Sequence, residues 1–288
     1  MIIIDYSAIA ISAILSQDIE PEEDMIRHMV LNSIRMHVQK FSKKYGDIVI
    51  AADNSSWRKE YFPEYKANRK TNREESTTID WDEIFRVVNL VLEELDEYSP
   101  YKVIKVKNCE ADDIIGTLCE YTQEFGKHEP VMIISGDKDF IQLHKFKNVA
   151  QYSPTQKKFV THKDPAQYLI EHVFKGDSGD GVPNVLSSDD TFIEKIRQKP
   201  VTKKKIELWT KNLNNLQEVM SNEEYKNYTR NSTVIDLSKT PVELKEKIIE
   251  EFEKEKESTP TKTSFMRYLI SKRCKQLISC IEEFYSCR

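Results

Sequence analysis

The sequence is poor in glycine, proline and cysteine, and each shortage excludes a class of protein. Seven glycines and ten prolines in 288 residues are too few for a collagen-like or low-complexity chain. The five cysteines form no Cys-x-x-Cys pair and have no accompanying histidine cluster, which argues against a zinc site or a disulfide framework. We therefore expect reduced thiols in a cytosolic protein.

Long apolar runs are also lacking. No stretch reaches the roughly 20 residues that a membrane-spanning helix needs, and the first five residues lack the basic flank and cleavage pattern of a signal peptide. We expect no membrane partner. The hydrophobic fraction of 39% still allows a substantial core. The net charge of −5 does not favour nucleic-acid binding, although the distribution of charge decides more than its sum.

The first half of the chain alternates apolar runs with amphipathic segments. Apolar runs at residues 2–4, 48–52, 103–106 and 131–134 predict strands. Helical spacing of apolar residues predicts helices over residues 25–45 and 81–95, and a third helix that opens at Glu110. Because such alternation implies right-handed crossovers, we predict an α/β fold with a mostly parallel central sheet and helices on both faces.

The second half is more helical and more polar. We expect a helix over 164–174, a turn-rich break over 175–183, a late strand over 233–237, a charge-dense helix or linker over 243–257 and one final helix over 264–285. The predicted domains are an α/β core at 1–160 and a smaller helical region at 161–288.

Acidic residues follow each of the four expected strands. The carboxyl ends of parallel strands share one sheet edge, where ligand crevices form, so these acids should gather there. Carboxylates are hard oxygen ligands that suit Mg²⁺ or Mn²⁺, and a pair of such ions can clamp a phosphodiester. The candidate ligands are Asp5, Asp53, Glu110, Asp112, Asp113, Asp137, Asp139, Asp177 and Asp180.

Each of these acids also has an ordinary structural explanation. Asp112 or Asp113, taken alone, is more readily explained by the preference of a helix N-terminus for negative charge. Asp177 and Asp180 alone would pass as loop residues. Asp137 and the acid two residues later point the same way if the backbone there is extended. The convergence of four strand ends on one edge favours the metal hypothesis for the group.

A basic and aromatic segment follows the second expected strand. Its aromatic residues are Trp57, Tyr61, Phe62 and Tyr65. Its bases, with one that follows shortly after, are Arg58, Lys59, Lys66, Arg69, Lys70 and Arg73. Bases bind phosphates and aromatic rings stack on unpaired nucleobases, so the segment indicates nucleic-acid binding. A solvated helix whose aromatic residues pack inward remains the alternative.

The acidic motifs, taken in order, resemble those of a known family. Glu110-Ala111-Asp112-Asp113, Ser135-Gly136-Asp137-Lys138-Asp139-Phe140 and Gly176-Asp177-x-x-Asp180-x-x-Pro183 resemble the 5′-nuclease superfamily. This superfamily includes flap endonucleases and the 5′-exonuclease domains of bacterial DNA polymerase I, and within it the chain resembles the ribonucleases H of T-even bacteriophages. The resemblance covers most of the chain and thins after about residue 185.

The resemblance implies a PIN-like core with two Mg²⁺ ions, for which Mn²⁺ may substitute. The tighter site would use Asp5, Asp53, Asp112 and Asp137. The second ion would use Asp139 and Asp180, with water-mediated contacts to Glu110, Asp113 and Asp177. The family's active-site pair corresponds to Tyr65 and Lys66. Lys66 would contact the scissile phosphate, and residues 57–80 would form an arch.

The implied activity is a structure-selective 5′→3′ exonuclease and flap endonuclease that removes RNA primers and 5′ flaps during phage DNA replication. Its substrates would be DNA with a 5′ flap, nick or RNA primer, and RNA–DNA hybrids, held in part by the helical region. It would act as a monomer in the cytoplasm of the infected bacterium, with a single-strand-binding protein and a sliding clamp as candidate partners.

Other functions stay open on the residues alone. A PIN-type endoribonuclease shares the acidic sheet edge, and a non-catalytic nucleic-acid-binding protein could carry structural acids. An aspartyl-phosphate phosphatase is disfavoured because Ser7 stands where that chemistry needs a second acid.

The sequence departs from the family pattern in two places. Residues 184–190 replace a Gly-Ile-Gly-like hairpin, so neither its grip on duplex DNA nor its binding of K⁺ is predicted here. The chain also begins almost at its first strand, without the N-terminal extension of the T-even enzymes, so any clamp contact made through that extension must differ here or be absent.

Overall fold

The computed structural model describes residues 1–15, 22–69, 80–254 and 260–285. Its contacts divide the chain into two compact units. Unit 1 contains residues 1–55, 79–161 and 242–288, and unit 2 contains residues 56–78 and 162–241. One boundary thus falls next to the one expected at residue 160, while the C-terminal helices belong by their contacts to unit 1. None of the described helices has the length and apolar character needed to cross a membrane.

Unit 1 is built on a six-stranded sheet with the order β3-β2-β1-β4-β5-β6. Strands β1 to β5 run parallel, and β6 pairs antiparallel with β5. The strands are β1 Ile2–Asp5, β2 Ile48–Ala51, β3 Lys102–Ile104, β4 Val131–Ile134, β5 Val149–Ser153 and β6 Lys158–Val160. The predicted mostly parallel sheet and its four expected strands are confirmed.

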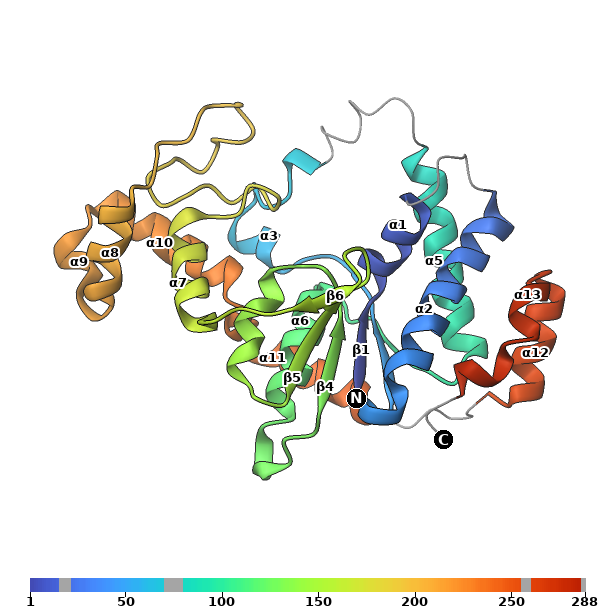
Figure 1. The fold of residues 1–288 in the computed structure, drawn as a ribbon. Helices are drawn as coiled ribbons and strands as arrows, with labels where there is room; N and C mark the ends of the chain where they lie inside the picture. The colour runs from blue at the N-terminus through green and yellow to red at the C-terminus, as the bar shows by residue number, and fades with distance from the viewer. Residues whose placement is uncertain (16–21, 70–79, 255–259, 286–288) are drawn as a thin grey trace. The chain divides into compact units, whose positions relative to one another are not determined.

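Helices cover both faces of this sheet (Figure 1). On one face α2 contacts β1 and β4, and α5 contacts β3; on the other, α6 contacts β1 and β2, and α11 contacts α6 and β3. The helices of unit 1 are α1 Tyr6–Leu15, α2 Glu23–Tyr45, α5 Trp81–Tyr98, α6 Ala111–Tyr121, α11 Val242–Glu253, α12 Lys262–Ser271 and α13 Lys275–Ile278. The described residues of unit 1 also form the 3₁₀ segments η1 Glu124–Gly126, η2 Asp139–Lys145 and η5 Ile281–Phe284.

Burial on both faces explains the continuous apolar runs of the central strands. Ile2 and Ile4 pack in the core formed with α2 and α5, and Ile3 between them points to the opposite face and is equally buried. A strand covered on both faces has no position for a solvated polar residue. Polar residues therefore begin only where each strand ends, which places them at the sheet edge.

The strand order creates a topological switch point between β1 and β4. From β1 the chain moves outward to β2 and β3, and it returns to the other side of β1 with β4 and β5. Ile4 pairs with both Ile50 and Ile134, so the three strands end at the same level. Crevices of open parallel sheets form at such a point.

Unit 2 is helical and has two small apolar cores. Its elements are α3 Arg58–Tyr61, α7 Pro165–Lys175, α8 Lys203–Lys211, η3 Leu213–Asn215, α9 Leu216–Val219, α10 Asn222–Ile235 and η4 Leu237–Lys239. One core packs Phe62 and Tyr65 against α7 and α10. The other centres on Phe174 and Trp209, whose ring centroids lie 5.1 Å apart.

The expected late strand over 233–237 is wrong. A capping box between Ser221 and Glu224 starts α10, which continues through Ile235. Val234 and Ile235 are adjacent apolar residues, which favour a strand locally, but both are buried at the end of this helix against Phe62 and its neighbours. Tertiary packing has overridden the local preference.

The single helix expected over 264–285 is interrupted. Helix α12 ends at Ser271, and Arg273 adopts a left-handed backbone with φ of 56°. The amide of Cys274 then donates to the carbonyl of Leu269 at 2.9 Å, which closes the helix end. The apolar positions still face one core because α13 and η5 continue after the turn. The segment at 243–257 is helical as α11 up to Glu253.

A buried arginine joins three helices of unit 1. Arg27 on α2 is 0% exposed, and its Nε donates to Glu94 of α5 at 2.8 Å. Glu94 also accepts from Tyr268 of α12 at 2.8 Å and pairs with Lys272 at 2.6 Å. The guanidinium additionally bonds Asp24 and Glu23 on its own helix. This network attaches the C-terminal helices to the core of unit 1.

Replacing Arg27 by alanine is expected to lower the free energy of unfolding by about 3–5 kcal/mol, because Glu94 is then left buried without its main partner. Urea unfolding measures this loss. Arg86→Ala is the matched control: its side chain is half exposed and pairs with Glu23 and Glu83, so the loss should stay below about 1 kcal/mol. Equal losses in the two variants would contradict the role given to the buried network.

Candidate active site

Asp5 is the buried acid of the sheet edge. It ends β1, is only 7% exposed, and is followed at once by α1. Its Oδ1 accepts from the Ala8 amide at 3.1 Å, and its Oδ2 accepts from Ser135 Oγ at 2.8 Å across the switch point. Neither α1 nor the role of Ser135 was predicted from the sequence, although Ser135 lies within the Ser135–Phe140 motif.

The electrostatics of Asp5 show that other acids lie near it. Burial is the largest cause that raises its pKa, and the negative charge of Asp53 adds to it. Hydrogen bonds from Ala8 and Ser135 act in the opposite direction, and Asp137 raises the pKa further. The pKa of Asp5 reaches about 7. The structure thus brings together acids from the ends of β1, β2 and β4, as the strand pattern predicts.

Asp137 follows β4 and is held by the backbone around it. Its amide donates to Ser135 Oγ at 3.1 Å, and its Oδ1 accepts from the Asp139 amide at 2.9 Å. Asp139 begins the 3₁₀ segment η2, so the extended backbone under which Asp137 and Asp139 would point the same way is not present. Gln151 on β5 donates to the Ser135 carbonyl at 3.0 Å and supports this turn from a position that no motif indicated.

The acids at the start of α6 lie at the candidate site, and some of them also cap the helix. Asp53 Oδ1 accepts from the Ala111 amide at 2.8 Å, which ties the end of β2 to the start of the helix. Glu110 and Asp113 form a reciprocal capping box, in which Asp113 Oδ2 accepts from the Glu110 amide at 2.9 Å. The capping explanation therefore applies to this pair, and their contact to a metal stays a prediction. Asp112, between them, is half-buried.

The donor set suits a hard divalent cation. Asp5, Asp53 and Asp137 offer carboxylate oxygens only, and the pKa of Asp5 is raised first by burial and then by repulsion from the other two acids. Bound cations remove such a conflict, because they favour the ionised form of each carboxylate. Asp137 and Ser135 also line a cavity of about 340 Å³ with Ala8 and Ser12 of α1. The Asp137 carboxylate thus has open space beside it, and metal binding by these acids stays a prediction.

In unit 2, Asp180 is the centre of a cluster of polar side chains. Its Oδ2 accepts from the Tyr65 hydroxyl at 2.8 Å and lies 3.4 Å from Lys66 Nζ, while its Oδ1 pairs with Arg69. The Lys66 amide donates to the Asp180 carbonyl at 2.8 Å and holds Lys66 at a φ of 57°. The predicted pair Tyr65–Lys66 and the predicted ligand Asp180 therefore meet within unit 2.

The turn that carries Asp180 is stiffened by Asp177. Asp177 and Val182 exchange backbone hydrogen bonds, and Asp177 Oδ1 accepts from the Asp180 amide at 3.0 Å. Gly176 has a positive φ, and a Cβ there would meet the Val182 carbonyl at 2.4 Å. Burial raises the pKa of Asp177, but hydrogen bonds from His172 and from the Asp180 amide outweigh it, so the pKa lies below its usual value. His172 was not identified from the sequence.

The basic segment divides into buried and exposed residues. Arg58 is 1% exposed, and its Nε donates to the Val234 carbonyl at 2.8 Å, so it belongs to the core of unit 2 and we correct its assignment to nucleic-acid contact. Lys59 is exposed, as is Arg69. The aromatic residues Phe62 and Tyr65 do pack inward. Lys70, Arg73 and the rest of the arch at 70–79 lie outside the described residues.

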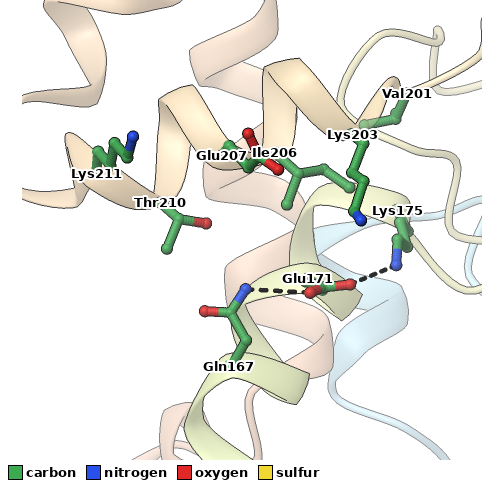
Figure 2. A pocket seen from close by; sticks show the side chains of 9 residues that line it. All are labelled: Gln167, Glu171, Lys175, Val201, Lys203, Ile206, Glu207, Thr210 and Lys211. Atoms are coloured by element: carbon green, nitrogen blue, oxygen red, sulfur yellow. Dashed lines mark hydrogen bonds and ion pairs between the residues drawn. The ribbon is translucent and has the colours of Figure 1, made fainter.

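A further cavity in unit 2, of about 490 Å³, lies between α7 and α8 (Figure 2). Its one acid on α7, Glu171, is already bonded to Gln167 at 3.1 Å and to Lys175 at 2.6 Å. The remaining lining is basic and apolar in the main, including Lys203 and Ile206. This cavity does not resemble a metal site.

Comparisons with known proteins match this arrangement. Residues 1–172 match the family described as "5′-3′ exonuclease, N-terminal resolvase-like domain". The chain belongs to this 5′-3′ exonuclease family. Residues 164–284 match the family described as "T4 RNase H, C terminal". The predicted resemblance is confirmed, and so is the expectation of a nuclease.

Relatives of this exonuclease-family chain include a whole-length match and shorter ones. Ribonuclease H of Enterobacteria phage T4 is 32% identical over 294 residues, which cover 98% of this chain and 95% of the relative. DNA polymerase I of Lactococcus lactis subsp. lactis is 28% identical over 169 residues, which cover 55% of this chain but 18% of the polymerase.

Two solved structures share the fold. The bacteriophage T5 5′-exonuclease with bound divalent zinc ions matches with a TM-score of 0.60 at 16% identity, covering 87% of this chain and 97% of that one. The T5 flap endonuclease in a pseudo-enzyme-product complex with DNA and metal ions matches with a TM-score of 0.60 at 16% identity, covering 88% and 99%.

The raised pKa of Asp5 predicts how the metal-free stability depends on pH. Its folded-state pKa of about 7 exceeds its ordinary value of 3.8, so the folded chain keeps a proton that the unfolded chain releases. The free energy of unfolding of the wild type, taken relative to that of Asp5→Asn, should therefore fall by up to about 4 kcal/mol as the pH rises from 4 to 7. Urea unfolding in EDTA across this range measures the difference, and a difference that does not change with pH would contradict the assignment.

Proposed function

We propose that this protein is a Mg²⁺-dependent, structure-selective 5′ nuclease that removes RNA primers and 5′ flaps from DNA. The observation that carries the proposal is the Asp5 carboxylate at the switch point of a parallel sheet, whose pKa is raised first by burial and then by the charges of Asp53 and Asp137. Membership of the exonuclease family supports it. The T5 flap endonuclease complex with DNA and metal ions, which shares the fold, supports it as well.

The chain's own residues prepare the sheet edge for this chemistry. Ala8 and Ser135 fix the two oxygens of Asp5, Ala111 fixes Asp53, and Asp139 fixes Asp137, so the carboxylates are oriented before a substrate binds. Mg²⁺ held there would polarise the phosphate and lower the pKa of an attacking water. Asp112 completes the predicted ligand set. The resemblance implies a second ion, for which Asp180 is the predicted ligand in unit 2 and Asp177 the predicted water-mediated contact.

Lys66 is proposed to stabilise the charge that develops on the scissile phosphate. In the structure its ammonium group neighbours Asp180, which also takes the Tyr65 hydroxyl and Arg69. If Asp180 binds a metal cation, as the sequence predicts, the cation would replace these donors at the carboxylate. Lys66 and Tyr65 would then turn toward the substrate.

The biological setting proposed for this activity follows from the sequence resemblance. The substrates are DNA with a 5′ flap, nick or RNA primer, and RNA–DNA hybrids. The protein would act as a monomer in the cytoplasm of an infected bacterium, next to a single-strand-binding protein and a sliding clamp. The T4 ribonuclease H relationship over nearly the whole chain supports this setting.

Asp137→Asn is expected to abolish Mg²⁺-dependent cleavage of a labelled 5′-flap duplex while leaving its binding largely intact, because the exposed carboxylate at this turn is replaced without a change of shape. Nicked and RNA-primed duplexes, and single-stranded RNA, are assayed in parallel with and without Mg²⁺.

Asp47→Asn is the control, since Asp47 precedes β2 at the opposite sheet edge and should leave cleavage unchanged. Normal turnover by the Asp137 variant would refute the assignment; preferred cleavage of the RNA would favour the endoribonuclease alternative.

Lys66→Ala is expected to lower the single-turnover cleavage rate by about 10²–10³-fold, as loss of a charge-stabilising donor predicts. Substrate affinity should change far less. Lys59→Ala, at an exposed position on α3, controls for the general effect of removing a base from this segment. Equal rates for the two variants would remove Lys66 from the proposed chemistry.

A further inference from the structure

Gln151 is a buried amide at a position of the sheet where its neighbours are apolar. Strand β5 lies beside β4 (Figure 1), and in their register Gln151 pairs with Ile133, which pairs in turn with Ile3 of β1. All three residues are 0% exposed. An isoleucine needs no hydrogen-bond partner there, whereas a buried amide is costly unless its polar atoms are bonded. Such an exception to apolar packing is expected where a functional site must be supported.

The amide nitrogen of Gln151 holds the turn that follows β4. Gln151 Nε2 donates to the Ser135 carbonyl at 3.0 Å and to the Asp137 carbonyl at 2.5 Å. The backbone of β5 holds the same turn, because the Ser135 amide donates to the Tyr152 carbonyl at 3.1 Å. Both N–H groups of the Gln151 amide are thereby used, and both acceptors belong to one turn.

The oxygen of the same amide is held by η2. His144, near the end of η2, places its Nε2 atom 3.1 Å from Gln151 Oε1. Because the Gln151 nitrogen faces two carbonyl oxygens, its oxygen must face His144, and the histidine must donate through Nε2. His144 therefore fixes the orientation of the Gln151 amide. One side chain thus joins residues 135, 137 and 144, which enclose the segment that carries Asp139.

The turn held by Gln151 orients two of the candidate ligands. Ser135 Oγ donates to Asp5 Oδ2 at 2.8 Å and accepts from the Asp137 amide at 3.1 Å. A shift of Ser135 would therefore move the donor that fixes Asp5, and a shift of the backbone at Asp137 would move that carboxylate itself. The family resemblance implies that both acids bind the same ion. Contacts that orient the ligands of a metal strongly affect its affinity, and their loss typically weakens binding about 10–100-fold.

We propose that Gln151 is a positioning residue that sets the affinity of this sheet edge for a divalent cation, acting through the turn at Ser135 and Asp137 and held in its orientation by His144. Because Gln151 is buried beneath the turn, it would touch neither the cation nor the substrate. The inference rests on the proposed function, since it takes Asp5 and Asp137 as metal ligands. Without the amide every carboxylate is still present, but the oxygens are no longer held in one arrangement.

Mn²⁺ binding to the full chain without DNA, measured by isothermal titration calorimetry, tests the proposal. Gln151→Met keeps the length of the buried side chain but removes both donors and the acceptor, so the Kd for Mn²⁺ should rise about 10–100-fold. In the cleavage assay the Mg²⁺ concentration that gives the half-maximal rate should rise with it. The rate at saturating Mg²⁺ should return close to that of the wild type, because every ligand is still present.

Asn148→Ala is the matched control for the loss of a bonded amide beside β5. Asn148 precedes β5 at the opposite sheet edge, where its Nδ2 donates to the Glu129 carbonyl at 2.7 Å and to Thr122 Oγ1 at 3.0 Å. Gln151→Met and Asn148→Ala should both lower the free energy of unfolding in EDTA, but Asn148→Ala should leave the Kd for Mn²⁺ unchanged. A purely structural role for Gln151 predicts instead that neither variant changes this Kd.

His144 offers a second pair of variants at a position that is only half-buried. His144→Leu removes the donor to Gln151 Oε1 and should weaken Mn²⁺ binding by a smaller factor than Gln151→Met does. His144→Gln keeps a side-chain N–H donor and should restore the affinity. This pair tests the proposal even if Gln151→Met does not fold.

Wild-type Mn²⁺ affinity in folded Gln151→Met would overturn the proposal, as would wild-type affinity in His144→Leu where Gln151→Met does not fold. If the wild type binds Mn²⁺ and cleaves flaps while these variants match it, only the role of Gln151 fails. A wild type that neither binds Mn²⁺ nor cleaves flaps would refute the proposed function, and this inference with it.

Discussion

The candidate chemistry depends on one constraint, which is the burial of the Asp5 carboxylate at the end of β1. The parallel sheet forces the ends of β1, β2 and β4 to the same level, so Asp53 and Asp137 oppose the ionisation of Asp5. Neutral donors, the Ala8 amide and the Ser135 hydroxyl, hold its oxygens in place and only partly offset the repulsion. A site with oriented oxygens and a net excess of negative charge is one that a divalent cation completes.

The central carboxylate of unit 2 has the opposite electrostatic surroundings. Asp180 is surrounded by the Tyr65 hydroxyl and by the cationic groups of Lys66 and Arg69. These contacts therefore orient Tyr65 and Lys66, which are proposed to contact the substrate, and they also satisfy the Asp180 carboxylate. Asp177 sets the turn beneath Asp180 through its own backbone and side-chain bonds. The buried carboxylate of Asp5 in unit 1 thus has other acids near it, whereas the carboxylate of Asp180 in unit 2 is paired with cationic groups and a hydroxyl.

The sequence predicted most of what depends on local pattern and missed what depends on distant partners. Apolar runs located the strands of the buried sheet, and position after a strand located Asp5 and Asp53. Strand β5 was missed because Ala150 and Gln151 interrupt its apolar pattern, yet Gln151 is buried there to support the turn at Asp137. Arg58 was misassigned because the sequence pattern of a base beside aromatic residues does not show whether the side chain faces solvent. In the structure Arg58 faces a carbonyl of α10.

The same limitation explains why the loop before α8 could not be recognised from sequence. Asn227, Arg230 and Asn231 recur at helical spacing, which ordinarily marks the solvated face of a helix. In the structure that face is buried, and its polar groups bond the carbonyls of Pro183 and Val185. Polar residues that a fold could leave in water are instead used to fix a connection between two helices. Because burial of these polar groups is costly unless each one is hydrogen-bonded, the bonds to Pro183 and Val185 favour one conformation of this connection over the others.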